Sequence, residues 1–330
     1  MINYDEFLNK KLVDVKPSGI RKFFAIAEEM DNVISLGVGE PDFLTPWHIR
    51  QTGIDYLEQG LTRYTANAGL AELRCEISNF YARNYLVKYD PKSEVLVTVG
   101  GSEGIDMAIR SIIQEGDEVL VIEPSFVCYK PIVEVSGGVA VPVPTYEKND
   151  FKVTPEDIEK AVTDKTKAIV LPYPNNPTGA ILSVKELEAL SDVIIKYNLF
   201  VISDEIYAAL TYTPEGHTTI ATIDGMQERT IIINGFSKTY SMTGWRLGYA
   251  LGPAPIIKQM TKLHQFAIMS APTNSQYAAI DALKNGDFDI MKMRDDYDMR
   301  RRFTVDGFRK IGLDCFEPMG AFYAFPCIKS

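Results

Sequence analysis

The sequence has few cysteines and histidines and no motif that would pair them. Its four cysteines are scattered and none forms a CxxC pair, which favours a reduced cytoplasmic setting over a disulfide framework. The three histidines lie far apart in the sequence, so no cluster of metal ligands is visible. We therefore expect no metal site, and we expect the histidines to be structural or exposed.

Long apolar and long basic runs are also absent. No stretch approaches the length of a membrane span, and the start of the chain does not resemble a signal peptide. The 34 basic and 44 acidic residues give a net charge of −10, which argues against a general role on nucleic acids or membrane surfaces. The length of 330 residues, 46% of them hydrophobic, allows a sizeable core and suggests about two domains.

From residue 94 onward, apolar runs alternate with amphipathic segments. Seven runs have the composition of strands, namely EVLVTVGG, DEVLVIEP, GGVAVPVP, KAIVLPYP, LFVISDEIY, TIIING and LGYALG. Fully apolar strands that alternate with helices are typical of a mainly parallel sheet covered on both faces. We predict an α/β fold with a mainly parallel seven-stranded sheet between helices, in which ligands bind beyond the carboxyl ends of the strands.

Helix signals occur before this region and within it. Residues 18–30 have an amphipathic pattern, and Thr45-Pro46 predicts an N-cap with a proline at the first helical position. Ser183 with Glu186 fits a capping box. Near the end of the chain, residues 289–310 predict a long charged helix, followed by a short strand pair. The cluster Arg300-Arg301-Arg302 on that helix is most simply a solvated face.

A lone lysine stands at an unusual place after one of the predicted strands. The β-branched run Ile231 to Ile233 predicts a buried strand, and Lys238 follows its end between Ser237 and Thr239. A lysine just past the carboxyl end of a buried strand is poorly solvated, which favours the neutral amine that a Schiff-base nucleophile needs. The ordinary alternative is a surface lysine whose chain lies along apolar residues and whose amine is solvated. The residues at the other strand ends must distinguish these two interpretations.

One of those strand ends has the composition of an anion cradle. Gly101, Ser102 and Glu103 stand between a strand and a helix, where free backbone N–H groups and small residues can receive an anion. A plain tight turn is the alternative, because neither a Walker loop nor GxGxxG is present. Ser237 adds a hydroxyl donor, and Arg246 suits bidentate phosphate binding.

Two further strand ends carry an acid, a phenol and an amide. Asp204 ends its strand and could keep a pyridine nitrogen protonated, while Tyr207 could reach a ring oxygen. Asn176 in the NNPTG turn could donate to that oxygen or could simply shape the turn. The sequence thus offers a phosphate cradle, an acid for a ring nitrogen, donors for a ring oxygen and a desolvated lysine. Pyridoxal 5′-phosphate needs all four.

Several motifs together resemble a known family. GFSKTYSMTGWRLGY, NNPTG, SDEIY, VGEPDF and the terminal GAFYAFP are similar to the fold-type I, class I aminotransferases that use pyridoxal phosphate. The resemblance covers nearly the whole chain and is strongest to the branch of bacterial aspartate, aromatic and related broad-range enzymes. It implies transamination between an L-amino acid and a 2-oxo acid, with 2-oxoglutarate as the expected acceptor, and it leaves the amino donor open.

The resemblance implies a role for each site residue. Lys238 would hold the cofactor as a Schiff base and shuttle the proton, and Asp204 would bind the pyridine nitrogen. Tyr207 and Asn176 would contact the phenolic oxygen of the ring, and Asn176 also lies by the substrate. The phosphate ligands that it implies are Gly101, Ser102, Glu103, Ser237 and Arg246.

The remaining implied contacts involve the ring face, the substrate and a second subunit. Phe126 would stack on the cofactor ring, although a core aromatic is the alternative. Tyr64 resembles the tyrosine that reaches the phosphate in the partner subunit, which implies a homodimer. Gly39 would offer a backbone contact to the substrate carboxylate, and Ile20 would help to line the substrate mouth.

The family pattern also divides the chain. We expect residues 1–44 to be the N-terminal segment of a small α+β domain, 45–285 a large cofactor-binding domain, and 286–330 the start of the C-terminal small domain. Relatives continue past GAFYAFP with an arginine that clamps the substrate α-carboxylate, and the sequence stops at Ser330 before it. We therefore expect a truncated small domain. Ser102 replaces a basic residue of some acid-preferring relatives, which slightly disfavours a strict aspartate enzyme.

Three other functions are compatible with parts of the pattern. The same site could perform β-elimination, as in cysteine-S-conjugate lyases, and only the products would distinguish the two. An amino-acid sensor domain of a regulator would need a DNA-binding module, which the first 35 residues cannot supply. A non-catalytic homologue would be expected to lose Lys238 or Asp204, and both are present.

Overall fold

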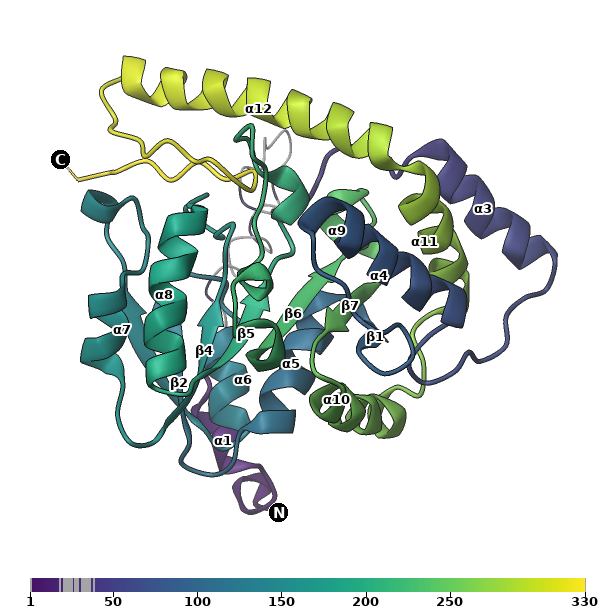
Figure 1. Ribbon diagram of the computed structural model, residues 1–330, viewed down its shortest axis with the longest axis horizontal. Helices are drawn as coiled ribbons and strands as arrows, with labels where there is room; N and C mark the ends of the chain where they lie inside the picture. The colour runs from purple at the N-terminus through teal and green to yellow at the C-terminus, as the bar shows by residue number, and fades with distance from the viewer. Residues whose placement is uncertain are drawn as a thin grey trace.

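The computed structural model describes residues 2–17, 19, 26, 30, 37 and 39–329. The helix expected at residues 18–30 falls almost entirely outside these residues, and Ile20 lies outside them. The body of the protein is a central sheet with helices packed on both faces (Figure 1). Within the described part of the chain, no helix is long and apolar enough to cross a lipid bilayer.

The sheet has seven strands in the order β1-β7-β6-β5-β4-β2-β3. Their bounds are Val95–Thr98 (β1), Glu118–Glu123 (β2), Val139–Pro144 (β3), Thr166–Leu171 (β4), Phe200–Asp204 (β5), Thr230–Gly235 (β6) and Gly248–Leu251 (β7). The pairs β2–β3, β2–β4, β4–β5 and β5–β6 are parallel, and β7 is antiparallel to both β1 and β6. The predicted mainly parallel seven-stranded α/β sheet is confirmed.

The apolar strands bury side chains on both faces, as continuous apolar runs require. On β6, Ile232 packs in one hydrophobic cluster, whereas Ile231 and Ile233 pack in another on the opposite face. The main helices are Trp47–Glu58 (α3), Ala71–Tyr85 (α4), Gly100–Ile112 (α5), Tyr129–Val135 (α6), Pro155–Ala161 (α7), Val184–Lys196 (α8), Ala254–Ala267 (α10), Thr273–Asn285 (α11) and Asp287–Lys310 (α12). Helices α4 and α11 contribute to the first cluster, while α5 and α10 contribute to the second.

The capping signals of the sequence have mixed outcomes. At α8, the Ser183 hydroxyl accepts from the Glu186 backbone N–H and the Glu186 carboxylate accepts from Ser183 N at 2.7 Å, so the predicted capping box is confirmed. At α3 the prediction is wrong by one residue, because the helix begins at Trp47 with Pro46 in the cap position. Thr45 instead donates its hydroxyl to Ser241 O at 2.6 Å, which ties this corner to the loop after β6.

The segment after α12 does not form the expected strand pair. In the part that the structure describes, residues 311–329 contain only isolated bridges, Cys315 with Pro326 and Gly320 with Thr211. Prolines lack the N–H that a continuous ladder needs, which explains why pairing stops at single bridges. The segment returns beneath α12, which runs along the top of Figure 1.

The three arginines on α12 do not all lie on a solvated face, and the prediction is wrong for Arg301. Arg300 forms an ion pair with Asp42 at 2.8 Å. The Arg301 side chain is only 11% exposed and pairs with Asp298 at 2.7 Å and with Glu317. The Arg300 and Arg302 side chains are 47% and 67% exposed, so both match the expectation. Arg301 thus links α12 to the segment that follows it.

This difference in burial predicts different costs of mutation. We expect Arg301→Ala to lower the free energy of unfolding by about 2 kcal/mol, because it removes the nearly buried guanidinium that joins the half-buried carboxylate of Asp298 to Glu317. Arg302→Ala, the neighbouring and solvated control, should change the melting temperature by less than about 1 °C. Thermal unfolding of both variants in one buffer measures the difference. Equal melting temperatures would contradict a structural role for Arg301.

Candidate active site

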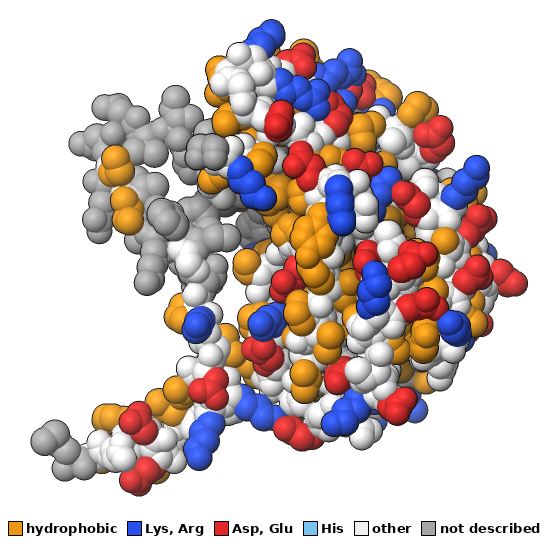
Figure 2. All heavy atoms as spheres, turned by 90° about the vertical axis from the view of Figure 1, so that its left-hand side faces the viewer, with side chains coloured by type: hydrophobic (Ala, Val, Ile, Leu, Met, Phe, Trp, Pro, Cys, Tyr) orange, Lys and Arg blue, Asp and Glu red, His pale blue; other side chains and the backbone are white. Residues whose placement is uncertain are grey.

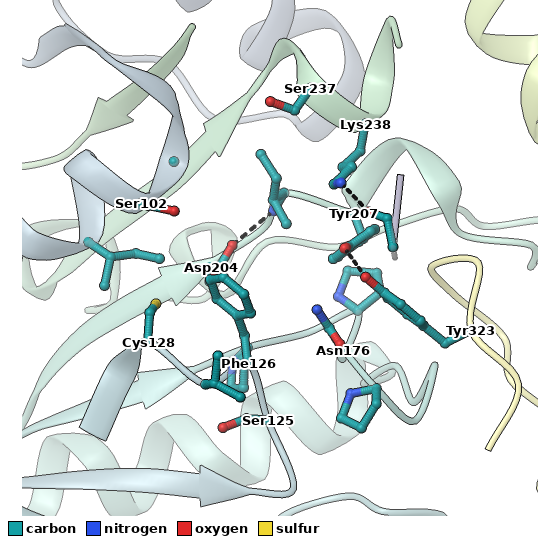
Figure 3. A pocket seen from close by; sticks show the side chains of 18 of the residues that line it. Ser102, Ser125, Phe126, Cys128, Asn176, Asp204, Tyr207, Ser237, Lys238 and Tyr323 are labelled. Atoms are coloured by element: carbon teal, nitrogen blue, oxygen red, sulfur yellow. Dashed lines mark hydrogen bonds between the residues drawn. The ribbon is translucent and has the colours of Figure 1, made fainter. Parts of the chain in front are cut away.

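A cavity of about 760 Å³ opens at the carboxyl ends of the central strands, and most of the predicted site residues line it (Figure 3). They come from loops and helix starts that follow β1, β2, β4, β5 and β6. The lining includes Gly39, Gly101, Ser102, Phe126, Asn176, Asp204, Tyr207, Ser237, Lys238 and Arg246. One edge of the sheet therefore collects residues that are up to about 200 positions apart, as strand ends of an α/β sheet should do.

Lys238 lies in the short helix α9 (Phe236–Thr239) that directly follows β6. Its Nζ donates to Gly39 O at 2.5 Å and lies 5.5 Å from the centre of the Phe322 ring. Burial lowers the pKa of Lys238 to about 8, with Glu40 raising it and Arg246 lowering it further. The amine is therefore partly neutral near physiological pH, in the direction that its place after a buried strand led us to expect.

Asp204, the last residue of β5, presents a buried carboxylate to the same cavity. Burial raises its pKa, two hydrogen bonds lower it, and the neighbouring charge of Glu205 raises it again. Those bonds come from the Tyr129 hydroxyl to Oδ2 at 2.6 Å and from Ile206 N to Oδ1 at 3.2 Å. The two donors fix the carboxylate in one orientation.

Tyr207 stands on the Lys238 side of the cavity in Figure 3 and pairs with a second tyrosine. The hydroxyls of Tyr207 and Tyr323 are 2.6 Å apart. Burial raises the pKa of Tyr207 well above its usual range, as does Tyr323, while a hydrogen bond with Asn176 lowers it. Phenol, phenol and amide thus form one cluster that can donate hydrogen bonds to an oxygen in the cavity.

The opposite end of the cavity has the features of an anion site. Helix α5 begins at Gly100, whose φ of +77° favours glycine and places the free N–H groups of the first turn at the strand end. A side chain at Gly100 would come within 2.6 Å of Arg246 Nη2, and one at Gly248 would come within 2.7 Å of Gly101 N. Glycines at these two positions therefore let an arginine and a helix N-terminus approach each other, which favours a bound phosphate.

Two of the residues expected to bind phosphate do not line this cavity. The Glu103 carboxylate instead accepts from Val99 N and lies 3.0 Å from His264 Nδ1, which is a stable arrangement for an acid in the first turn of a helix. The Glu103 side chain therefore lies outside the cavity lining, while a contact from its backbone N–H to a phosphate stays a prediction. Tyr64 is 80% exposed and lies away from the cavity of its own chain.

Sequence reasoning missed two tyrosines that contact the site. Tyr129 opens α6 three residues after Phe126, and Tyr323 lies inside GAFYAFP, which served only as a family marker. The signal was weak in both cases, because a lone aromatic in an apolar segment is normally a core residue. Their partners, Asp204 and Tyr207, are distant in sequence and become neighbours only through the sheet order.

The sheet order and the site together define a class of protein. A lysine after the sixth strand, an acid at the end of the fifth and an anion cradle after the first characterise the fold-type I enzymes that use pyridoxal phosphate. These three features come from the ends of β6, β5 and β1, and in the sheet β7 lies between β1 and β6.

The chain belongs to the class I and II aminotransferases, and it is an aminotransferase. The family described as "Aminotransferase class I and II" matches residues 31–330. An aspartate aminotransferase of Pyrococcus abyssi is 44% identical over 324 residues, 98% of this chain and 83% of the relative. The Bacillus subtilis protein YugH, which carries an aminotransferase name, is 50% identical over 98% of this chain and 84% of its own length. A Thermus thermophilus aspartate aminotransferase structure with maleate has a TM-score of 0.92 at 35% identity, over 96% of this chain and 84% of that chain.

The lowered pKa of Lys238 predicts that its amine reacts with acylating reagents at a lower pH than an ordinary lysine does. In the cofactor-free protein, half of the Lys238 amine is neutral at a pH of about 8, whereas an ordinary lysine reaches that point near 10.5. Competitive acetylation followed by peptide mass spectrometry should give a rate profile centred near pH 8. Lys196 is the internal control, since its hydrogen bond with Glu159 raises its pKa. A Lys238 profile that coincides with that of Lys196 would contradict the prediction.

Proposed function

We propose that this aminotransferase binds pyridoxal 5′-phosphate and exchanges amino groups between an L-amino acid and a 2-oxo acid. The amino donor is aspartate, an aromatic amino acid or a similar compound, and the acceptor is 2-oxoglutarate. The observation that carries the proposal is the pairing of a lysine of lowered pKa, Lys238, with a buried carboxylate, Asp204, in one cavity.

The donor set of the cavity fits this cofactor. Arg246, the first turn of α5 and the hydroxyls of Ser102 and Ser237 would hold the phosphate. Asp204 would hold the ring nitrogen, and Phe126 would cover one face of the ring. When bound, pyridoxal phosphate supplies an electron sink that stabilises negative charge at the substrate α-carbon.

The residues of the chain supply proton transfer and orientation. Lys238 can accept a proton from the substrate α-carbon in its neutral form and return it, because its pKa of about 8 lies close to working pH. The carboxylate of Asp204 keeps its position through the hydrogen bonds from Tyr129 and Ile206. Tyr207 and Asn176 offer donors on the Lys238 side, where they orient the reacting end of a bound ligand.

We also propose that the active unit is a cytoplasmic homodimer in which Tyr64 reaches the partner's cavity. Support comes from exposed side chains on two connected segments. Tyr64 is 80% exposed, and Asn67, three residues later, donates to Met269 O at 2.8 Å, while Phe266 and Met269 are 86% and 46% exposed. The N-terminal segment projects from the body and leaves Phe7 78% exposed, while charges of both signs are mixed over the visible face (Figure 2). The four free cysteines suit a reducing compartment.

The deciding experiment supplies single amino acids to the purified protein loaded with pyridoxal phosphate. Loss of the absorption of the lysine-bound cofactor identifies the donor, and formation of glutamate from 2-oxoglutarate identifies the acceptor. Release of pyruvate and ammonia without any acceptor would instead make the protein a β-eliminating lyase. Failure to bind pyridoxal phosphate would overturn the proposal as a whole.

Replacing the lysine gives a direct prediction. Lys238→Ala should lower kcat by at least about 10³-fold, because it removes the group that moves the proton. Lys262→Ala on α10, an exposed lysine that does not line the cavity, is the matched control and should keep full activity. Stopped-flow spectroscopy of the half-reaction measures both. Normal cycling by the Lys238 variant would refute this role.

A further inference from the structure

Glu205 is a fully buried carboxylate that the proposed reaction does not use. It follows Asp204 directly and is 0% exposed. Its side chain does not line the active-site cavity. It lies instead beside a water-sized cavity of about 10 Å³, which Ser203 and His217 also line. The backbone N–H of Glu205 donates to Ile233 O at 2.8 Å, so the residue extends the pairing of β5 with β6 to the very end of the strands.

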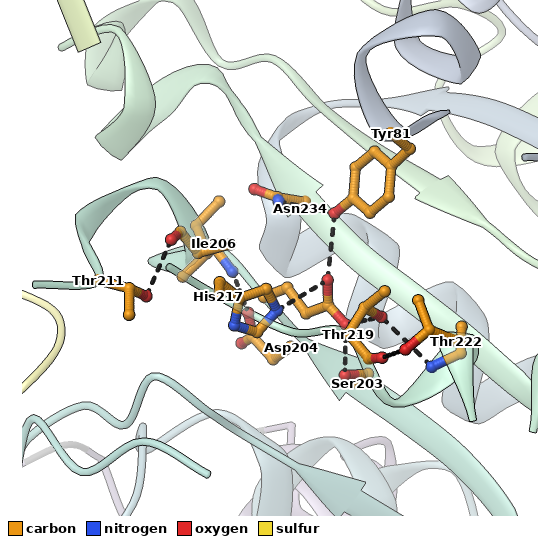
Figure 4. A network of polar contacts seen from close by, with 12 residues as sticks. Tyr81, Ser203, Asp204, Ile206, Thr211, His217, Thr219, Thr222 and Asn234 are labelled. Carbon is orange, nitrogen blue, oxygen red and sulfur yellow. Dashed lines mark hydrogen bonds and ion pairs between the residues drawn. The ribbon is translucent and has the colours of Figure 1, made fainter. Parts of the chain in front are cut away.

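Four side chains surround this carboxylate (Figure 4). The hydroxyls of Ser203 and Thr219 donate to Oε1 at 2.9 and 2.5 Å. The Tyr81 hydroxyl donates to Oε2 at 3.3 Å, and His217 Nε2 lies 3.2 Å from the same oxygen. A buried carboxylate persists only when donors replace its water, so this set holds Glu205 in one orientation.

A chain of hydrogen bonds connects Glu205 to the turn that carries Lys238. Asn234 Nδ2 donates to the Tyr81 hydroxyl at 2.8 Å, and Tyr81 in turn donates to Glu205. Asn234 Oδ1 accepts from Gly235 N at 2.7 Å. Gly235 is the cap residue of α9, the four-residue helix that contains Lys238. The bonds from Asn234 through Tyr81 point toward the carboxylate, an arrangement in which successive hydrogen bonds strengthen one another.

Stability alone does not account for this network. Buried charged networks contribute little net stability compared with apolar residues of equal volume, and their attested use is to fix one geometry. Apolar side chains could fill this part of the core, because Ile231, Ile232 and Ile233 occupy the three positions before Asn234 on the same strand. The polar residues begin where β6 ends and α9 starts, which is where the direction of the Lys238 side chain is decided.

We propose that Glu205 is a positioning residue for Lys238 and that it acts through Tyr81 and Asn234. The carboxylate anchors Tyr81, Tyr81 orients the Asn234 amide, and Asn234 holds the Gly235 N–H from which α9 departs. This inference rests on the proposed function, because it takes Lys238 as the residue that binds the cofactor.

The test removes one hydroxyl from the chain of bonds. Tyr81→Phe keeps the ring in the core but disconnects Asn234 from Glu205. Tyr89→Phe is the matched control, because Tyr89 is 2% exposed and its hydroxyl has no hydrogen-bond partner among the described residues. Both variants lose one buried hydroxyl and differ only in its connection to the network.

Three measurements separate positioning from simple destabilisation. In the loaded protein, Tyr81→Phe should weaken pyridoxal phosphate binding by about fivefold and shift the pH midpoint of the cofactor absorption by about half a unit. In the cofactor-free protein, amide hydrogen exchange of residues 235–240 should be about fivefold faster. Tyr89→Phe should match the wild type in all three quantities. Equal behaviour of the two variants would overturn the proposal.

A second variant keeps the test independent of how well Tyr81→Phe folds. Glu205→Gln preserves volume and removes the charge, and it also removes a repulsion that raises the pKa of Asp204. Coupling is therefore the quantity to measure: the absorption shift of the double variant should be smaller than the sum of the two single shifts. Additive shifts would refute the chain of bonds. If the wild type bound no pyridoxal phosphate, the proposed function would fail, whereas the exchange comparison would still decide the positioning role.

Discussion

The parallel pairing of β5 with β6 is the constraint on which the site depends. It places Asp204 opposite Ile233, so the carboxylate and the turn that carries Lys238 emerge from adjacent strands at one edge. Both side chains line the cavity, where Asp204 is buried and Lys238 is half-buried. Burial moves the pKa of the lysine down and that of the acid up, and each shift comes from the same loss of solvent. The fold thereby prepares the amine chemically as well as geometrically.

Polar groups at this edge are held from two sides of the sheet. On the cavity side, Tyr129 and Ile206 fix Asp204 through its two oxygens. On the other side, hydroxyls and a histidine surround Glu205. Adjacent residues of one strand end thus serve opposite faces, as the alternation of side chains along a strand requires. The charge of Glu205 disfavours the ionised form of Asp204, and the hydrogen-bond donors around each carboxylate offset this repulsion.

Much of this could be predicted from the sequence because its signals are local. Apolar runs ended by glycines, prolines or acids identified the seven strands, and Ser183 with Glu186 identified a helix start. Predictions failed where the outcome depends on distant partners. The surroundings of Arg301 depend on Glu317, and those of Glu103 depend on His264, which is 161 residues away. The partners of Tyr129 and Tyr323 are likewise set by strand order, which periodicity does not reveal.

The antiparallel direction of β7 has a consequence for ligand retention. Because β6 ends and β7 begins at the same edge, with Gly235 opposite Gly248, the connecting loop leaves and returns beside the cavity. Lys238 and Arg246 are the two pocket-lining cations of that one loop. In the function that we propose, Lys238 would bind the cofactor covalently and Arg246 would bind its phosphate, so both attachments would lie on one short loop whose two ends are paired in the sheet. A cofactor released from Lys238 during turnover would still be bound by Arg246. Each reaction cycle would then break one attachment without dissociation of the cofactor.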